Sequence, residues 1–114
     1  MARKIGQLLD LTGKTALVTG GSRGLGLQLA HALGEAGAKV VVSSRKASEL
    51  EAAVAELSGA GIDARWIAAD CAVDSEIERL AIEVLERVGD VDILVNNAGA
   101  SWGAPAEDHP AAAW

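Results

Sequence analysis

A glycine-rich turn near the start of the chain limits what it can fold into more than any other feature. An apolar run at residues 15–19 ends at Gly20, and a helical pattern of leucines begins around Gly24 and Gly26. Glycine permits a tight bend at Gly20, and the missing side chains at Gly24 and Gly26 let a phosphate or the sheet approach the backbone. The first N–H groups of a helix and its dipole attract anions. The turn therefore predicts a strand, a phosphate-binding bend and a helix in succession.

The spacing of these glycines qualifies that prediction. It is G-x-x-x-G-x-G, which differs from the G-x-G-x-x-G of the general dinucleotide fingerprint. A glycine cluster alone is weak evidence, because an ordinary structural turn has the same composition. The position of this cluster between an expected strand and an expected helix favours nucleotide binding.

The composition predicts a core of small and aliphatic side chains. Half of the 114 residues are hydrophobic, but the aromatic residues are three Trp, with no Phe and no Tyr. Helices packed closely on a parallel sheet use such a core. The length suffices for one domain, which we expect to span residues 1–114.

Charge and cysteine content exclude several classes of partner. The formal net charge is −6 and the chain has no run rich in Lys or Arg, so we expect no nucleic-acid partner. The single cysteine, Cys71, excludes an internal disulfide and fits a reducing compartment. No apolar run approaches the roughly 20 residues that span a bilayer, and we identify no signal peptide or metal-ligand constellation. We expect a cytoplasmic protein with no membrane partner.

Apolar runs and amphipathic segments alternate along the chain. Strand patterns lie at residues 15–19, 39–43, 64–68 and 91–95. Helical periodicity lies at residues 24–36, 46–58 and 75–88, with a further helix pattern beginning at Pro110. Helices between successive strands imply right-handed crossovers and parallel strands. We therefore expect a three-layer α/β fold whose parallel strands lie in the order 3-2-1-4.

Three residues within these elements have expected structural roles. Asp74 can cap the third helix through its side chain. Gly34 lies inside the first helix at a cost relative to Ala, which close packing would explain. His31 is expected on a solvated helix surface.

Two motifs follow the first and fourth strands, which are neighbours in the expected sheet. The glycine turn follows the first strand, and Asn96, Asn97, Ala98 and Gly99 follow the fourth. In open α/β sheets, ligands bind outside the carboxyl ends of the strands at this switch in strand order. The amides of Asn96 and Asn97 can also bridge the two strand ends, and this structural role is compatible with lining a site.

The end of the second strand favours NADP over NAD. An acidic residue near this position takes the ribose 2′-OH in NAD-binding folds, but the sequence here is Ser43-Ser44-Arg45. Arg45 can pair with a 2′-phosphate, with help from the Ser44 hydroxyl, and Arg23 can approach from the glycine turn. The alternative is that both arginines are solvated surface cations.

Asp70 and Cys71 follow the third strand. At a carboxyl strand end, the Asp70 carboxylate can accept a hydrogen bond from an adenine amino group. The alternative for Asp70 is a turn-capping role. For Cys71, the residue type alone favours a small buried filler.

Together these motifs resemble the short-chain dehydrogenase/reductase family. The match rests on residues 19–26 and 96–99, with Asp70 between them. It implies a Rossmann fold and NAD(P)(H)-dependent interconversion of carbonyl and hydroxyl groups of a small-molecule substrate. Ser44-Arg45 is similar to the NADP-preferring members, and the chain resembles 3-oxoacyl-carrier-protein reductases and gluconate 5-dehydrogenases. The cofactor contacts implied are Gly20, Ser22, Arg23, Gly24, Leu25, Gly26, Ser44, Arg45, Asp70, Cys71, Asn96, Ala98 and Gly99.

The departure from the family pattern is the missing catalytic set. Family members act through Asn, Ser, Tyr and Lys, the last two spaced Tyr-x-x-x-Lys, and this chain has no Tyr. We therefore carry over no catalytic residue. The resemblance implies an N-terminal part of the fold, truncated before the catalytic half and inactive alone, with homo-oligomers expected only for a full-length form.

Two other interpretations are open. The first is a non-catalytic NADP(H)-binding or regulatory module. The second is a structural homo-oligomer that pairs through the apolar strand at residues 91–95. An unpaired apolar strand edge at this position is a predicted aggregation site, which weighs against a free-standing module.

Overall fold

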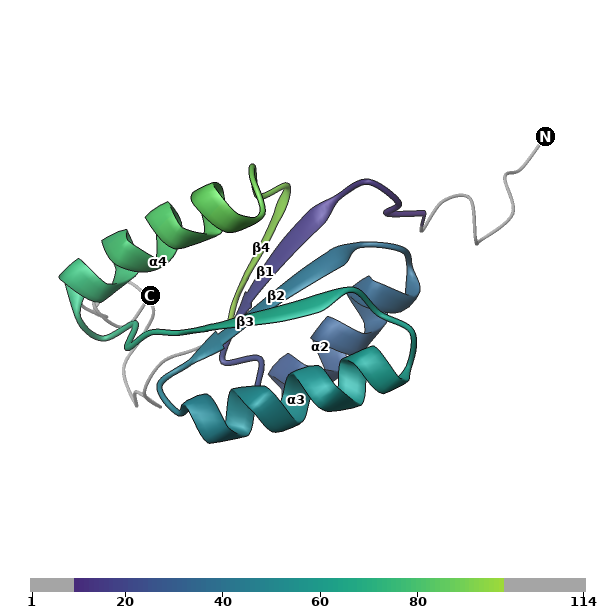
Figure 1. The fold of residues 1–114 in the computed structure, drawn as a ribbon, viewed down its shortest axis with the longest axis horizontal. Helices are drawn as coiled ribbons and strands as arrows, with labels where there is room; N and C mark the ends of the chain where they lie inside the picture. The colour runs from purple at the N-terminus through teal and green to yellow at the C-terminus, as the bar shows by residue number, and fades with distance from the viewer. Residues whose placement is uncertain (1–9, 98–114) are drawn as a thin grey trace, which may run out of the picture.

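The computed structural model describes residues 10–97 as strands and helices in alternation (Figure 1). Each of β1, β2 and β3 is followed by a helix that returns the chain to the same end of the sheet. The elements are β1 (Thr15–Thr19), α2 (Gly24–Glu35), β2 (Lys39–Ser44), α3 (Ala47–Gly59), β3 (Ala64–Ala68), α4 (Asp74–Arg87) and β4 (Ile93–Asn96).

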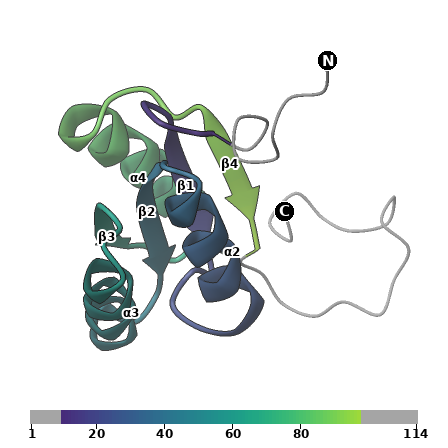
Figure 2. The ribbon, with the colours of Figure 1, turned by 90° about the vertical axis from the view of Figure 1, so that its right-hand side faces the viewer.

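The four strands form one parallel sheet in the order β3-β2-β1-β4. The predicted strand order and parallel sheet are confirmed. The register places Thr19 beside Ser43 on one side and beside Asn96 on the other. The carboxyl ends of β1 and β4 are therefore adjacent, and β4 lies along the edge of the described sheet (Figure 2).

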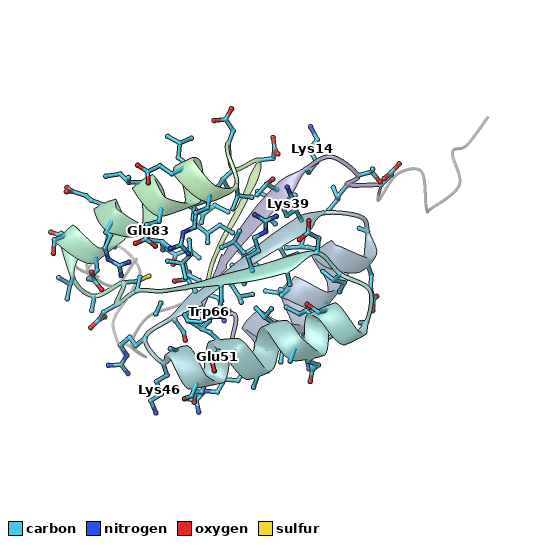
Figure 3. All side chains as sticks on the ribbon, in the orientation of Figure 1. Lys14, Lys39, Lys46, Glu51, Trp66 and Glu83 are labelled. Atoms are coloured by element: carbon cyan, nitrogen blue, oxygen red, sulfur yellow. The ribbon has the colours of Figure 1, made fainter. Side chains whose placement is uncertain are left out.

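Helices cover both faces of the sheet, α2 and α3 on one face and α4 on the other (Figures 1 and 2). Alternate strand residues point to opposite faces, so each face has its own buried cluster. Trp66 of β3 packs against the cluster on the α3 side (Figure 3). The cluster on the α2 and α3 side contains Val18, Ala30, Val40, Val42, Leu50, Leu57 and Ile62. The cluster under α4 contains Leu17, Val41, Ile67, Ala69, Leu80 and Val84.

The largest difference from the predicted boundaries is at the fourth strand, which begins at Ile93 rather than at residue 91. Asp92 explains the late start. Its carboxylate Oδ2 accepts a hydrogen bond from the Thr15 N–H at 2.9 Å, and its own N–H donates to the Thr15 carbonyl at 2.9 Å. The Asp92 side chain thus takes the place of a backbone carbonyl as the acceptor for the Thr15 N–H. Regular pairing of β4 with β1 starts one residue later, at Ile93.

The prediction that Asp74 caps the third helix is wrong. Asp74 is the first residue of α4, and Val73 occupies the cap position without a side-chain hydrogen bond. The reason lies four residues earlier: the Asp70 carboxylate and carbonyl accept the N–H groups of Ala72 and Val73 and set where the helix begins. The Asp74 carboxylate instead lies in the first turn, where it complements the helix dipole.

Two other expectations have opposite outcomes. Close packing at Gly34 is confirmed, because a Cβ atom there would overlap the side chain of Ile62. His31 is not simply a solvated side chain, since its Nε2 lies 2.6 Å from a carboxylate oxygen of Glu56 and links α2 to α3.

Several apolar residues of α4 and β4 are exposed, with Leu94 at 64%. In the part of the chain that the structure describes, none of the helices is long and apolar enough to cross a membrane.

Candidate functional site

The carboxyl ends of β1 and β4 are joined through Thr19. Its hydroxyl accepts a hydrogen bond from the Asn97 N–H at 3.1 Å and lies 3.2 Å from the Asn96 side-chain oxygen. The Asn97 side-chain amide donates to the Gly20 carbonyl at 3.5 Å. The predicted bridging of the two strand ends by Asn96 and Asn97 is therefore confirmed. The glycine turn and the start of the second motif lie together at one edge of the sheet.

The glycine turn has a backbone that few other residues could adopt. Gly20 has a φ of 69° and Gly24 a φ of 58°, both in the left-handed region. The N–H groups of Gly20 and Gly21 donate to the Ser43 carbonyl at 2.7 and 3.4 Å, which continues the β1–β2 pairing into the turn. A Cβ atom on Gly26 would overlap the Gly20 carbonyl oxygen. The turn thus brings the start of α2 directly against the end of β1.

The N-terminus of α2 is open to an anion. The first N–H groups of a helix have no partner within it, and the N-cap residue Arg23 provides no side-chain hydrogen bond. The first turn of α2 contains no acidic residue. Ser22 is half-buried and Leu25 is 62% exposed, so this end of the helix faces outward. Such a terminus can bind phosphate oxygens through backbone N–H groups.

The two candidate arginines lie on turns that follow neighbouring strands. Arg23 is in the turn after β1, with 82% of its side chain exposed and its guanidinium 3.9 Å from the Glu49 carboxylate. Arg45 follows β2 and is exposed. Ser44 ends β2, and its hydroxyl accepts the Lys46 N–H at 3.4 Å. Sequence reasoning missed Glu49, although an acid in the first turn of α3 is visible in the sequence.

The structure shows the turn-capping role of Asp70. Its Oδ1 accepts a hydrogen bond from the Ala72 N–H at 3.0 Å. A carboxylate has further acceptor capacity, so the adenine contact predicted for Asp70 is compatible with this turn. Cys71 is half-buried against the cluster under α4. Burial raises the pKa of its thiol, and the nearby carboxylates of Asp70 and Glu76 raise this pKa further.

Sequence reasoning missed an arginine next to this loop. The Arg79 guanidinium donates to the Ala68 carbonyl at 2.6 Å and to the carboxylates of Glu76 and Glu83 at 2.8 and 2.9 Å. Its hydrogen bonds to these carboxylates raise the pKa of Arg79, and the bond from Arg79 is the largest cause of the lowered pKa of Glu76. The spacing of the two glutamates from Arg79 is that of helix ion pairs, but the contact with Ala68 has no sequence signal.

Two of the predicted cofactor contacts, Ala98 and Gly99, lie outside the described residues. The other eleven residues lie within the described part of the chain, and their contact with a cofactor stays a prediction. Among residues 10–97, no group of three or more His, Cys, Asp or Glu side chains is placed to hold a metal ion.

Comparison with known proteins decides the family. The model of the short chain dehydrogenase family matches residues 14–114. The chain belongs to this family. The resemblance predicted from the two motifs is thereby confirmed, as is the Rossmann-type fold.

Curated short-chain dehydrogenases similar to the chain are longer than it is. A rhamnolipid-biosynthesis 3-oxoacyl-[acyl-carrier-protein] reductase of Pseudomonas aeruginosa is 45% identical over 105 residues, which are 92% of this chain and 41% of the relative. Gluconate 5-dehydrogenase of Gluconobacter oxydans is 39% identical over 108 residues, 94% of this chain and 42% of the relative. The chain thus spans about two fifths of the length of these relatives.

A solved structure also matches this chain over only part of its own length. The NADP active-site complex of RhlG from Pseudomonas aeruginosa superimposes with a TM-score of 0.77 at 44% identity. The similarity covers 82% of this chain and 37% of the RhlG chain.

Proposed function

We propose that this chain binds NADP(H) at the carboxyl edge of its sheet, as the cofactor-binding part of an oxidoreductase. The observation that carries the proposal is the bend from Gly20 to Gly26, which sets an uncapped helix N-terminus beside the end of β4. The N–H groups of this turn, including those of Ser22 and Leu25, would bind the pyrophosphate.

The other predicted residues would bind the rest of the cofactor. Arg45 and Arg23, with the Ser44 hydroxyl, would bind the 2′-phosphate. The Asp70 carboxylate, with Cys71 beside it, would bind the adenine. Asn96, Ala98 and Gly99 would line the wall that follows β4.

Several observations support NADP rather than NAD. β2 ends in Ser43 and Ser44 and is followed by Arg45, so the strand end lacks the acidic residue that takes the ribose 2′-OH in NAD-binding folds. A phosphate and a guanidinium pair through charge-assisted hydrogen bonds. RhlG, whose structure is similar, was solved as an NADP complex. We infer the same preference for this chain.

The proposed reaction interconverts a carbonyl and a secondary alcohol of a small molecule. When bound, NADPH would supply the hydride. The residues of this chain would bind and orient the cofactor and would not transfer the proton, since the chain has no Tyr for that role. We expect the 114-residue chain alone to bind cofactor without turnover, and we place it in the cytoplasm.

Titration of the 114-residue chain with NADPH and with NADH tests the binding proposal. Nicotinamide fluorescence should show NADPH binding at least about tenfold tighter than NADH, a difference of one charge-assisted interaction. Gly26→Val is the negative control, because its side chain would block the bend. Equal or tighter binding of NADH would overturn the assignment of NADP.

A second candidate function is a non-catalytic NADP(H)-binding or regulatory module, which the absence of Tyr favours. The two candidates differ in what the coding DNA contains downstream of the codon for Trp114. An in-frame Tyr-x-x-x-Lys motif supports the reductase, and its absence supports the module.

A further inference from the structure

The loop between β3 and α4 carries Asp70 and is attached to α4 by one side chain. Arg79 Nη2 donates to the carbonyl of Ala68, the last residue of β3, at 2.6 Å. The remaining donors of the guanidinium are directed at Glu76, at 2.8 and 3.0 Å, and at Glu83, at 2.9 Å. Figure 3 shows Glu83 on the side of α4 nearer to β3. The guanidinium is therefore fixed on three sides.

Glu76 extends this attachment to Asp70 itself. Its carboxylate accepts the bonds from Arg79, and the Asp70 backbone N–H also contributes to lowering its pKa. Between the two attachment points lies Ala69, which is buried and whose N–H donates to the Ser44 carbonyl at 2.9 Å. The backbone of residues 68–70 is thus held from α4 on one side and from β2 on the other.

We propose that Arg79 and Glu76 are positioning residues that fix the β3–α4 loop so that the Asp70 carboxylate faces the adenine amino group. This inference rests on the proposed function. Asp70 Oδ1 is occupied by the Ala72 N–H, which leaves Oδ2 for a ligand. The direction of Oδ2 follows from the backbone that Arg79 and Glu76 hold.

The partial exposure of Arg79 and Glu76 indicates that their hydrogen bonds affect the geometry of the β3–α4 loop more than the stability of the fold. The side chains of Arg79 and Glu76 are 39% and 35% exposed. Ion pairs with this exposure contribute little to folding, because solvent and salt screen them. A loop that is already ordered loses no further conformational entropy when the ligand binds. The hydrogen bonds of Arg79 and Glu76 therefore affect mainly the affinity for the ligand.

The test compares NADPH with deamino-NADPH, in which hypoxanthine replaces adenine and the amino group is absent. The 114-residue chain and its variants are titrated with both. For the wild type we expect deamino-NADPH to bind about tenfold more weakly, the effect of one hydrogen bond to a charged group. In Arg79→Ala this ratio should fall to about two, because the carboxylate is no longer held toward the base. A purely structural loss would weaken both ligands equally and leave the ratio unchanged.

Arg87→Ala is the matched control, since Arg87 is on the same helix and approaches the same Glu83, at 3.9 Å. It should keep the tenfold ratio. Arg79→Lys, which retains the charge but not the fork, should give an intermediate ratio and serves if Arg79→Ala does not fold.

The outcomes separate the inference from the proposed function. A wild type that binds neither ligand overturns both. A wild type that binds NADPH but shows no preference over deamino-NADPH overturns the adenine contact and the inference. Retention of the wild-type ratio in Arg79→Ala, or in Arg79→Lys if only that variant folds, overturns the inference alone.

Discussion

The carbonyl oxygen of Gly20 occupies the space that a Cβ atom of Gly26 would need. The two residues belong to different parts of the turn, one at the end of β1 and the other in the first turn of α2. Their contact sets how closely the helix N-terminus approaches the end of the strand. It brings the first backbone N–H groups of α2 close to the carboxyl end of β1, where we propose that the cofactor phosphates bind.

Gly26→Ala should therefore be severely destabilising for a single methyl group. We expect a loss of about 3 kcal/mol in the free energy of unfolding, the upper range for overpacking against atoms that cannot move easily. Urea denaturation followed by circular dichroism measures it, and NADPH titration should show a parallel loss of binding.

Two other glycines serve as controls for that variant. Gly24→Ala has open space around its Cβ but a φ of 58°, so it should lose only about 1–2 kcal/mol through backbone strain. Gly59→Ala, with open space and ordinary φ at the end of α3, should be neutral or stabilising by up to about 1 kcal/mol. Equal stability of all three variants would contradict the role of the Gly20 contact.

Arg45→Asp should separate the two nicotinamide cofactors. The substitution sets a carboxylate against the 2′-phosphate, and like charges repel, so NADPH affinity should fall at least about tenfold. NADH affinity should change by no more than about threefold, because NADH lacks that phosphate. Arg87→Asp makes the same change in net charge at the end of α4 and should alter neither affinity strongly. Similar losses for both cofactors in Arg45→Asp would remove Arg45 from the site.

Glu49 provides a test in which NADPH affinity is expected to rise rather than fall. Its carboxylate lies 3.9 Å from the Arg23 guanidinium, so it would compete for this guanidinium with the 2′-phosphate of the proposed cofactor. Glu49→Gln should raise NADPH affinity a few-fold and leave NADH affinity unchanged. The gain should shrink at high salt, which screens exposed charges. Unchanged NADPH affinity would show that Arg23 does not reach the phosphate.

Much of the fold could be predicted because it depends on local patterns. The bounds of β1 and β3 agree with the predicted ranges, since each apolar run ends in a turn. The start of β4 could not be predicted, because the Asp92 carboxylate bonds to Thr15, a residue 77 positions away. The cap of α4 was missed because Asp70 and Asp74 are both plausible turn residues, and only the folded loop shows which one sets the helix start.

The candidate site also has features that could be predicted from the sequence and features that could not. Glycine spacing and the carboxyl-edge rule predicted where the turn and Asn97 meet, since both follow from strand order. The role of Arg79 could not be predicted, because its partner at Ala68 is a backbone carbonyl, and every residue has one. The Arg23–Glu49 pair depends on how two turns approach each other, which no periodicity encodes.

Cys71 should react slowly with thiol reagents at neutral pH. Burial, with the carboxylates of Asp70 and Glu76, raises the pKa of its thiol, so less thiolate is present at pH 8 than for a free cysteine. The rate of alkylation by iodoacetamide should therefore rise with pH to a midpoint above the ordinary thiol value. Asp70→Asn removes one negative charge and should lower that midpoint, whereas Asp63→Asn should not. A midpoint below the ordinary value would contradict the buried, acidic surroundings of the thiol.

Ser43 and Thr19 are neighbours in the sheet whose buried hydroxyls differ in their partners. Ser43 is fully buried, and its Oγ has no hydrogen-bond partner among residues 10–97, whereas the Thr19 hydroxyl accepts the Asn97 N–H. An unpartnered buried hydroxyl retains its desolvation cost, so Ser43→Ala should stabilise the chain by about 1 kcal/mol. Thr19→Val leaves the Asn97 N–H without its acceptor and should cost about 1–2 kcal/mol. Urea denaturation of both variants measures the contrast. If Ser43→Ala proves as destabilising as Thr19→Val, the Ser43 hydroxyl has a partner elsewhere in the chain, and the difference between the two positions disappears.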